Sequence, residues 1–150
     1  MRAIVQRVSG CRVIVEDQIV GKIGQGLCLL VAAHKNDDET RIRKLADKIV
    51  NLRIFNDECG KLNLSLLDLA SLGNQIGILA ISNFTVYGDT SKSRRPSFIE
   101  SAPFDEGKHH FESLVAHLRQ TGLRIETGQF GADMTVSIEN DGPVTVIVEC

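Results

Sequence analysis

The order of the hydrophobic patterns constrains the fold of this chain most strongly. Segments that alternate apolar and polar residues, or that are rich in β-branched residues, are typical of strands, and they fall into three groups. Two segments with apolar residues at helical spacing separate these groups. The sequence therefore predicts an α+β (mixed α/β) domain in the order β-α-β-α-β. We expect a curved or barrel-like pair of β-sheets flanked by two main helices.

The strand patterns differ in how deeply each strand should be buried. Residues 3–8, 12–15 and 19–23 alternate or are β-branched, and a polar turn at 16–18 lets the last two pair as a hairpin. Two continuous apolar runs, residues 27–33 and 77–82, are typical of strands buried on both faces. Three further strands are predicted at residues 123–127, 134–139 and 144–149.

Both helical patterns carry an apolar stripe and a boundary signal. The first follows an N-cap at 36–38, and the second runs roughly from Asp105 to Gln120 and ends before Gly122. A short helix is predicted at 65–70. The residues expected to face the core are Ile42, Leu45, Ala46, Ile49 and Val50 in the first helix, and Phe111, Leu114, Val115 and Leu118 in the second.

The composition bounds the function classes. A chain of 150 residues with 43% hydrophobic and 24% charged residues predicts one globular domain spanning 1–150. Its net charge of -2 means that any nucleic-acid contact must be a local patch. The four cysteines lack the spacing of a metal site, so we expect no metal and a reducing compartment. Without a signal-peptide pattern or an apolar run of roughly 18 residues, the expected location is cytoplasmic, with no membrane partner.

Two neighbouring stretches carry candidate functional side chains. In "SNFTVYGD", Ser82 and Thr85 place hydroxyls at the end of a buried strand, but a nucleophile needs a base and none is evident. In "SKSRRPSF", the cations are Lys92, Arg94 and Arg95, within a long loop at 88–103. A solvated loop and a contact to phosphates are both open for these cations.

Three other features leave alternatives open. His34 follows a strand and is a possible base, whereas metal binding by Glu106 and His110 is disfavoured. The loop from Gly128 to Met134 is either a pocket wall or part of the core. In "NDGPVT", residues 140–145, Asn-Asp-Gly is a hairpin signal, yet the following proline removes a ladder donor.

Read together, a set of motifs resembles the D-aminoacyl-tRNA deacylase family over nearly the whole chain and in the family's order. The matching motifs are Arg7-Val8, Gly26-Leu27, the run from Lys48 to Phe55, Ser82-Asn83-Phe84-Thr85, Arg94 to Phe98, Thr127 to Met134, and Asn140 to Thr145.

This resemblance implies a hydrolase that cleaves the ester between a D-amino acid, or glycine mischarged on tRNA-Ala, and the terminal ribose of tRNA. It implies no cofactor, no DNA partner, and a homodimer with active sites at the subunit interface. It also implies that Gly142-Pro143 is cis, reaches into the partner's pocket and is held by Arg7. Its main-chain oxygens would then exclude L-amino acids, while glycine would pass.

The resemblance also assigns roles within the site. Phe84, Phe130, Met134 and Ala102 would line the pocket, Thr85 and Ser82 would contact the scissile end, and Asn83, Arg7 and Asn140 would complete substrate binding. Lys92, Arg94 and Arg95 would meet acceptor-stem phosphates. Either Thr85 attacks to form an acyl-enzyme, or a ribose hydroxyl of the tRNA assists water; the missing base favours the second. Backbone amides near Phe84 and Thr85 are candidate oxyanion donors.

The chain departs from the family pattern at four positions: Asn83 replaces Gln, Ser93 replaces Gly, Ser101 replaces Ala, and His34 occupies an uncommon place. Two alternatives therefore accompany the main expectation. One is a relative that edits an L-amino acid, which requires a trans Gly142-Pro143 bond. The other is a non-catalytic RNA-binding module that uses the loop from Lys92 to Arg95.

Overall fold

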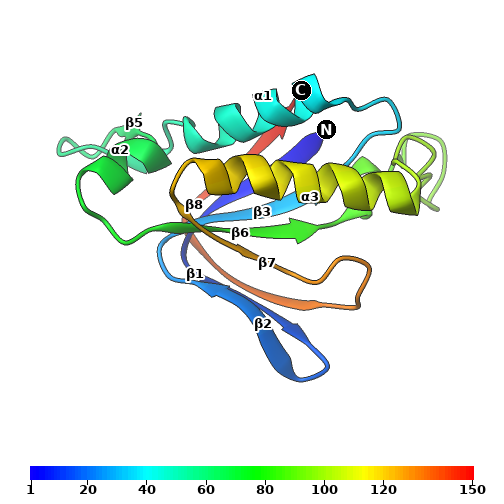
Figure 1. Ribbon diagram of the computed structural model, residues 1–150, viewed down its shortest axis with the longest axis horizontal. Coiled ribbons are helices and arrows are strands. Elements are labelled where there is room, and N and C mark those ends of the chain that lie inside the picture. The colour runs from blue at the N-terminus through cyan, green and yellow to red at the C-terminus, as the bar shows by residue number, and fades with distance from the viewer.

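The computed structural model describes all residues 1–150 and contains one curved main sheet with two long helices over one face (Figure 1). The main sheet contains β1 (Arg2–Val15), β2 (Gln18–Ile23), β3 (Gly26–Ala32), β6 (Gly77–Ser82), β7 (Arg124–Thr127) and β8 (Thr135–Glu149). The helices are α1 (Glu39–Val50), α2 (Leu66–Ser71) and α3 (Phe104–Gln120), with a 3-10 segment η1 (Phe84–Tyr87). A small second sheet pairs β4 (Phe55–Asn56) with β5 (Leu62–Leu64).

The main sheet is nearly closed into a barrel. Its strand order is β2-β1-β3-β6-β7, and β8 pairs with β1 outside this path. β3, β6 and β7 are parallel, whereas β1 is antiparallel to its neighbours. The two ends of the path approach each other, because a Cβ on Gly21 of β2 would lie 2.5 Å from the carbonyl oxygen of Thr127 in β7. The predicted mixed α/β class and barrel-like curvature are confirmed.

The predicted division of the last strand is wrong, because residues 134–139 and 144–149 belong to one strand, β8. Asn-Asp-Gly does not reverse the chain here. β8 instead runs antiparallel to β1 along nearly its whole length. Gln6 pairs with Thr145 and Val8 with Asn140, so the single β1 residue between them, Arg7, faces four residues of β8. These four residues, 141–144, form a bulge that we call the Gly-Pro bulge.

The first strand was also divided wrongly, since residues 3–8 and 12–15 are parts of the single strand β1. One other correction is small. α3 begins at Phe104 rather than Asp105, with Pro103 as its N-cap.

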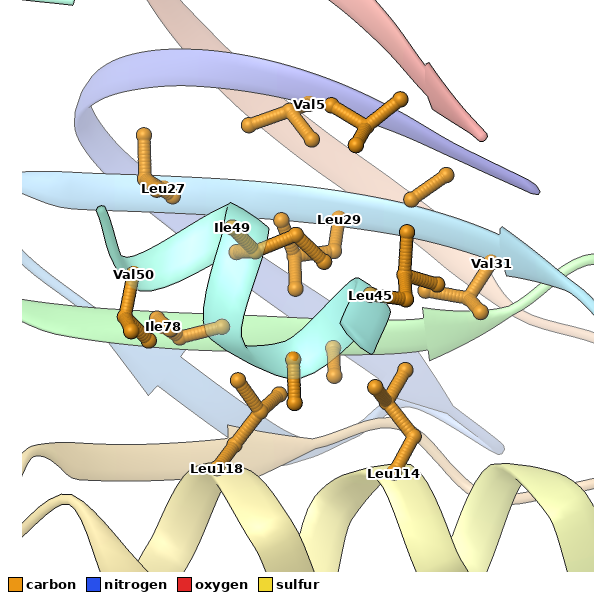
Figure 2. Packing of buried hydrophobic residues seen from close by; sticks show 14 of the residues in the cluster. Val5, Leu27, Leu29, Val31, Leu45, Ile49, Val50, Ile78, Leu114 and Leu118 are labelled. Carbon is orange, nitrogen blue, oxygen red and sulfur yellow. The ribbon is translucent and has the colours of Figure 1, made fainter. Parts of the chain in front are cut away.

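The core lies between the sheet and the two long helices (Figure 2). Both predicted helical stripes are buried in full: Ile42, Leu45, Ala46, Ile49 and Val50 of α1, and Phe111, Leu114, Val115 and Leu118 of α3. They pack against alternate residues of the central strands, such as Val5, Leu29 and Ile78. Asp38 caps α1 by accepting a hydrogen bond from the Arg41 N–H at 2.8 Å, as its position predicts.

The other face of the sheet carries a second, smaller apolar cluster, which contains Cys11 and Cys28. Both of these cysteines are buried, and all four cysteines are free thiols. The side chains form no group of three or more His, Cys, Asp or Glu that suits a metal ion. No helix combines the length and apolar character that a membrane crossing requires.

Candidate active site

One pocket of about 570 Å³ gathers six of the residues expected at the site. It lies where β6 ends, beside the start of α3 and the loop between β7 and β8. The expected residues that line it are Ser82, Asn83, Phe84, Ala102, Phe130 and Met134. Fourteen of its nineteen lining residues are hydrophobic, so the pocket is an apolar cavity with a polar edge at the end of β6.

The chain leaves β6 in a way that fixes this polar edge. The Asn83 N–H donates to the Val31 carbonyl at 2.7 Å, which extends the pairing of β6 with β3 by one residue. The 3-10 segment η1 then turns the chain, and the Phe84 ring meets the edge of the Phe98 ring with centroids 5.1 Å apart. Phe84 remains 59% exposed, so it lies at the pocket mouth.

The opposite wall depends on close backbone approaches in the loop from Gly128 to Met134. A Cβ on Gly128 would lie 2.7 Å from the Met134 Sδ atom, so glycine leaves room for that side chain. Gly131 has φ +75°, and a Cβ there would lie 2.9 Å from Phe104 Cζ. This loop was predicted as either a pocket wall or core, and four of its residues contribute to the wall: Phe130, Gly131, Ala132 and Met134.

Two consecutive residues of the long loop join it to the pocket. The Ala102 N–H donates to the Ala33 carbonyl at 2.9 Å, and the Ser101 hydroxyl donates to the Phe84 carbonyl at 3.0 Å. The loop end therefore bonds to both the end of β3 and the start of η1. Ser101, one of the departures from the family pattern, thus has a defined partner that an alanine would lack.

Thr85 does not line the pocket, although it directly follows two residues that do. Its hydroxyl donates to the Asn83 Oδ1 atom at 2.5 Å. The partner of the Thr85 hydroxyl is therefore an amide oxygen, which is no general base. This contact also shows what the shorter Asn83 side chain does in place of the glutamine.

No Asp, Glu, His, Lys or Arg side chain lines the pocket. General acid–base catalysis by a side chain needs such a group within hydrogen-bonding reach of the proton that moves. The pocket therefore offers a ligand apolar walls, one side-chain amide and one serine hydroxyl, together with backbone groups.

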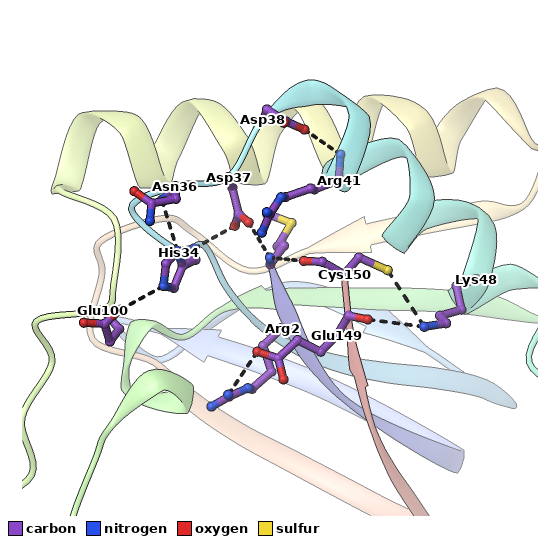
Figure 3. A network of polar contacts seen from close by, with 11 residues as sticks. Arg2, His34, Asn36, Asp37, Asp38, Arg41, Lys48, Glu100, Glu149 and Cys150 are labelled. Carbon is purple, nitrogen blue, oxygen red and sulfur yellow. Dashed lines mark hydrogen bonds and ion pairs between the residues drawn. The ribbon is translucent and has the colours of Figure 1, made fainter.

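His34, the possible base, lies outside the pocket in a polar network (Figure 3). Its Nε2 atom is 3.0 Å from Glu100 Oε2, and Lys35 Nζ donates to Glu100 Oε1 at 3.0 Å. The hydrogen bond from Lys35, and to a smaller extent the one with His34, holds the pKa of the Glu100 carboxyl below its usual value. The His34 ring also meets Tyr87 edge-on, with centroids 5.3 Å apart. His34 thus ties the long loop to the end of β3, and the prediction of a base finds no geometric support.

The Gly-Pro bulge also lies outside its own chain's pocket. Gly142-Pro143 is a cis peptide bond, as the resemblance implies, and Gly142 has φ +114°. Both residues are exposed, and neither lines the pocket. The pocket residue Val136 is four positions before Asn140 in the same strand, a separation of about 13 Å at ~3.3 Å per residue.

The side chains of Arg7 and Asn140 contact the bulge and fix its position on β1. Arg7 is only 7% exposed, and its Nη1 atom donates to the Ile54 carbonyl at 2.9 Å and to Asn56 Oδ1 at 3.2 Å. Its Nε atom forms an ion pair with Asp141, 2.9 Å from Oδ2. The Asn140 amide donates to the carbonyl of Arg7, opposite the bulge, at 2.9 Å and to the carbonyl of Val144, the last bulge residue, at 3.1 Å.

The three loop cations are all exposed and form no ion pair within the chain. Lys92, Arg94 and Arg95 lie in a loop that is closed by paired backbone hydrogen bonds between Asp89 and Ser97, at 2.8 and 2.9 Å. Ser93, another departure, donates from its hydroxyl to the Arg95 carbonyl at 2.7 Å. The positive charge of this loop is therefore free to meet an anionic ligand.

Sequence reasoning missed Phe104 as a pocket residue. Phe104 lines the pocket, is 64% exposed, and meets the Phe130 ring with centroids 5.2 Å apart. In the sequence, Phe104 is a single aromatic residue between Pro103 and the predicted start of the helix at Asp105. An isolated aromatic residue there does not stand out without knowledge of what the helix start faces.

The chain is similar to known proteins over nearly its whole length. A family model described as D-Tyr-tRNA(Tyr) deacylase matches residues 4–149. Proteins named D-aminoacyl-tRNA deacylase are similar: one from Clostridium botulinum (strain Alaska E43 / Type E3) is 48% identical, and one from Thermosipho africanus (strain TCF52B) is 50% identical. Each match covers 99% of this chain and 97% of the relative.

Two solved structures share the fold. One, titled c-Myc DNA Unwinding Element Binding Protein, has a TM-score of 0.91 and 36% identity, over 100% of this chain and 99% of that chain. The other, titled as a probable eukaryotic D-amino acid tRNA deacylase, has a TM-score of 0.82 over 99% and 98% of the two chains. Its 15% identity limits that likeness to the fold.

Proposed function

This chain belongs to the D-Tyr-tRNA(Tyr) deacylase family, and from that premise we propose that it hydrolyses the ester bond of D-aminoacyl-tRNA. The products are a free amino acid and tRNA, and glycine mischarged on tRNA-Ala is a second substrate. The protein then acts in the cytoplasm as a proofreading enzyme of translation. The observation that carries the proposal is the apolar pocket whose only polar edge is the end of β6, at Ser82 and Asn83.

The pocket suits an aminoacyl ester that is selected by handedness rather than by side-chain chemistry. Its walls are mostly hydrophobic and carry no charged side chain that would select one amino acid. Ser82 and Asn83 then contact the scissile end, while Phe130, Met134 and Ala102 surround the amino-acid part. Such a site accepts side chains of many kinds, provided that another element reads the configuration at the α-carbon.

The mechanism that we propose relies on positioning. Because the Thr85 hydroxyl donates to Asn83 and no base lines the pocket, a ribose hydroxyl of the tRNA assists the attacking water. The N–H groups of Phe84 and Thr85 begin η1, so no carbonyl of that turn bonds to them. They are the donors that stabilise the developing oxyanion.

Chiral selection in this proposal requires a second copy of the chain. Neither Gly142 nor Pro143 lines its own chain's pocket, so in this proposal their carbonyl oxygens meet the substrate in the pocket of a partner. There the main-chain oxygens of Gly142 and Pro143 accept from the substrate's amino group and occupy the space of an L side chain. Glycine has no side chain to clash and is accepted.

An apolar row on the outer face of the sheet supports a homodimer with active sites at the interface. Ile147, Ile4 and Leu30 are direct neighbours across β8, β1 and β3, so their side chains share one face. Ile147 is 69% exposed and lies near the C-terminal end of β8. Covering this row with a second copy buries it, and a two-fold axis there carries each bulge toward the other chain's pocket.

Lys92, Arg94 and Arg95 are the proposed contacts to the acceptor-stem phosphates. They are exposed and unpaired, and the Phe98 end of their loop packs on Phe84 at the pocket mouth. A phosphate backbone that leads away from an ester bound in the pocket would pass this loop. Such contacts position the tRNA without reading its sequence.

The direct test compares D-Tyr-tRNA and L-Tyr-tRNA as substrates of the purified protein. We expect preferential loss of the D-ester, and sedimentation should show a dimer. Equal turnover of both esters would contradict chiral proofreading and favour an editor of L-amino acids. Binding of tRNA without turnover of either ester would instead support the RNA-binding alternative.

A further inference from the structure

We propose that Phe104 is a stacking platform for the terminal nucleobase of the tRNA ester. This inference rests on the proposed function and extends it to a residue outside the motifs. Phe104 combines three properties: it lines the pocket, its side chain is 64% exposed, and its ring is held in place from two sides.

The ring of Phe104 is fixed rather than free. Its neighbour Phe130 meets it at 74° with ring centroids 5.2 Å apart, an edge-to-face contact that is favourable for aromatic rings. Its tip lies over the backbone of Gly131, where a Cβ would be 2.9 Å from Cζ. Gly131 has φ +75°, a conformation that suits glycine, so the close approach and the backbone conformation require the same residue.

An aromatic ring that is anchored in this way yet mostly exposed leaves a large apolar area in water. Burying such a side chain is favourable, so a ligand that covers the ring gains affinity. The exposed face adjoins the pocket that holds the aminoacyl group in the proposed function. In an aminoacyl-tRNA, the group that directly follows the ester is the terminal nucleoside, whose flat base has the shape to cover a phenyl ring.

Charge near the pocket agrees with this occupant. The unpaired cations Lys92, Arg94 and Arg95 lie in the loop whose end, from Ser101 to Pro103, leads directly into Phe104. Aromatic platforms next to cationic loops are a common arrangement for single-stranded nucleic acid, since the bases stack while the cations meet phosphates. An apolar protein partner would not require the adjacent cations.

The test uses two non-hydrolysable inhibitors of D-Tyr-tRNA deacylation. One is D-tyrosine joined by an amide to 3′-amino-3′-deoxyadenosine, and the other is the same compound without the base. In Phe104→Leu, which keeps an apolar side chain but removes the π face, we expect the inhibition constant of the adenosine compound to rise about tenfold or more. The base-free compound should inhibit the variant and the parent protein equally, and Phe104→Tyr should retain tight binding.

A matched control is Leu72→Ala, which alters another apolar residue that is 70% exposed, at the end of α2. It should leave both inhibition constants unchanged. An equal rise for the two compounds in Phe104→Leu would overturn the proposal, because Phe104 would then contact the amino-acid part. A change in oligomeric state would overturn it too, as Phe104 would be a subunit contact.

The proposed function can fail separately from this inference. If the parent protein does not deacylate D-Tyr-tRNA, direct titration by calorimetry replaces the inhibition assay. Tenfold weaker binding of the adenosine compound to Phe104→Leu would still support stacking. Equal binding of that compound to the parent and Phe104→Leu proteins would refute it.

Discussion

The guanidinium of Arg7 lies directly against Gly142, with its Nη2 atom 2.9 Å from the position that a Cβ on Gly142 would occupy. The same hypothetical Cβ would lie 2.8 Å from Val144 Cγ2. The bulge is therefore packed so closely on a buried arginine that only glycine fits. Sequence positions 7 and 142 thus form one structural unit, which the proposed chiral filter uses.

Gly142→Ala should lower D-Tyr-tRNA deacylation by about 100-fold, since displacing a positioning group by about 1 Å has an effect of this size. The substitution forces the bulge away from Arg7 and Val144. The measurement is single-turnover deacylation of D-Tyr-tRNA. Gly73→Ala is the matched control, because Gly73 also has a positive φ, +84°, but a Cβ there has no neighbour within 4 Å. Full activity in Gly142→Ala would contradict the filter.

Thr85→Ala should keep measurable activity, with a loss of about tenfold or less, and Thr85→Ser should be affected even less. The Thr85 hydroxyl has an amide oxygen as its partner and no base, so its removal costs orientation rather than a nucleophile. A tRNA with a 2′-deoxy terminal adenosine should instead react at least about 100-fold more slowly. Detection of an acyl group on Thr85 by mass spectrometry would establish the competing acyl-enzyme mechanism.

Arg7→Met should destabilise the protein by about 2–3 kcal/mol, because it removes charge-assisted hydrogen bonds of a buried side chain. The free energy of unfolding, measured with urea, tests this value. Asp141→Asn is the control. It removes only the half-exposed partner of Arg7 and should cost less than about 1 kcal/mol. Equal effects of the two changes would mean that the ion pair, and not the Ile54 and Asn56 contacts, holds Arg7.

The tie between Glu100 and its partners should weaken in acid. Lys35 and His34 lower the pKa of the Glu100 carboxyl in the folded state, so its stabilising contribution is present above the ordinary carboxyl pKa of 4.5. That contribution is lost as the pH falls through the lowered value. We therefore expect Glu100→Gln to lower the melting temperature at pH 7 but not at a pH below the folded-state pKa. A difference that is the same at both pH values would contradict this assignment.

Replacing Lys92, Arg94 or Arg95 singly with alanine should raise KM with little change in kcat. Each cation that meets a phosphate should also contribute about one to the salt dependence of tRNA binding, measured as the slope of log affinity against log salt. Lys61→Ala, in the loop before β5, is the control for the loss of one exposed positive charge. An unchanged slope in all three loop variants would place the tRNA elsewhere.

Much of the fold follows from local signals. The stripes of α1 and α3 were predicted to the residue, and the N-cap at Asp38 matches the structure, because helical periodicity and capping depend on residues within a turn or two of each other. The limits of β6 were likewise predicted. The family motifs also identified six residues that line one pocket, since those residues occur within short characteristic stretches.

The errors arise where contacts between distant residues decide the structure. Asn-Asp-Gly is a turn signal within its own few residues, but pairing of β8 with β1 on both sides of it keeps the chain running in one direction. Thr85 is close in sequence to the pocket residues, yet η1 turns its hydroxyl to Asn83. Phe104 becomes a pocket residue only because the loop from Gly128 to Met134 packs on the start of α3.

The amino-acid sequence by itself determined the helices, most strands, the apolar faces and the family, because each depends on short-range periodicity or on short motifs. Only the tertiary structure decided that residues 141–144 form a bulge within β8 rather than a hairpin, that His34 binds Glu100 outside the pocket, and that no charged side chain lines the pocket. These features depend on strand register and on loops that meet across the sheet. Residues far apart along the chain become neighbours only after the sheet has curved and the helices have packed.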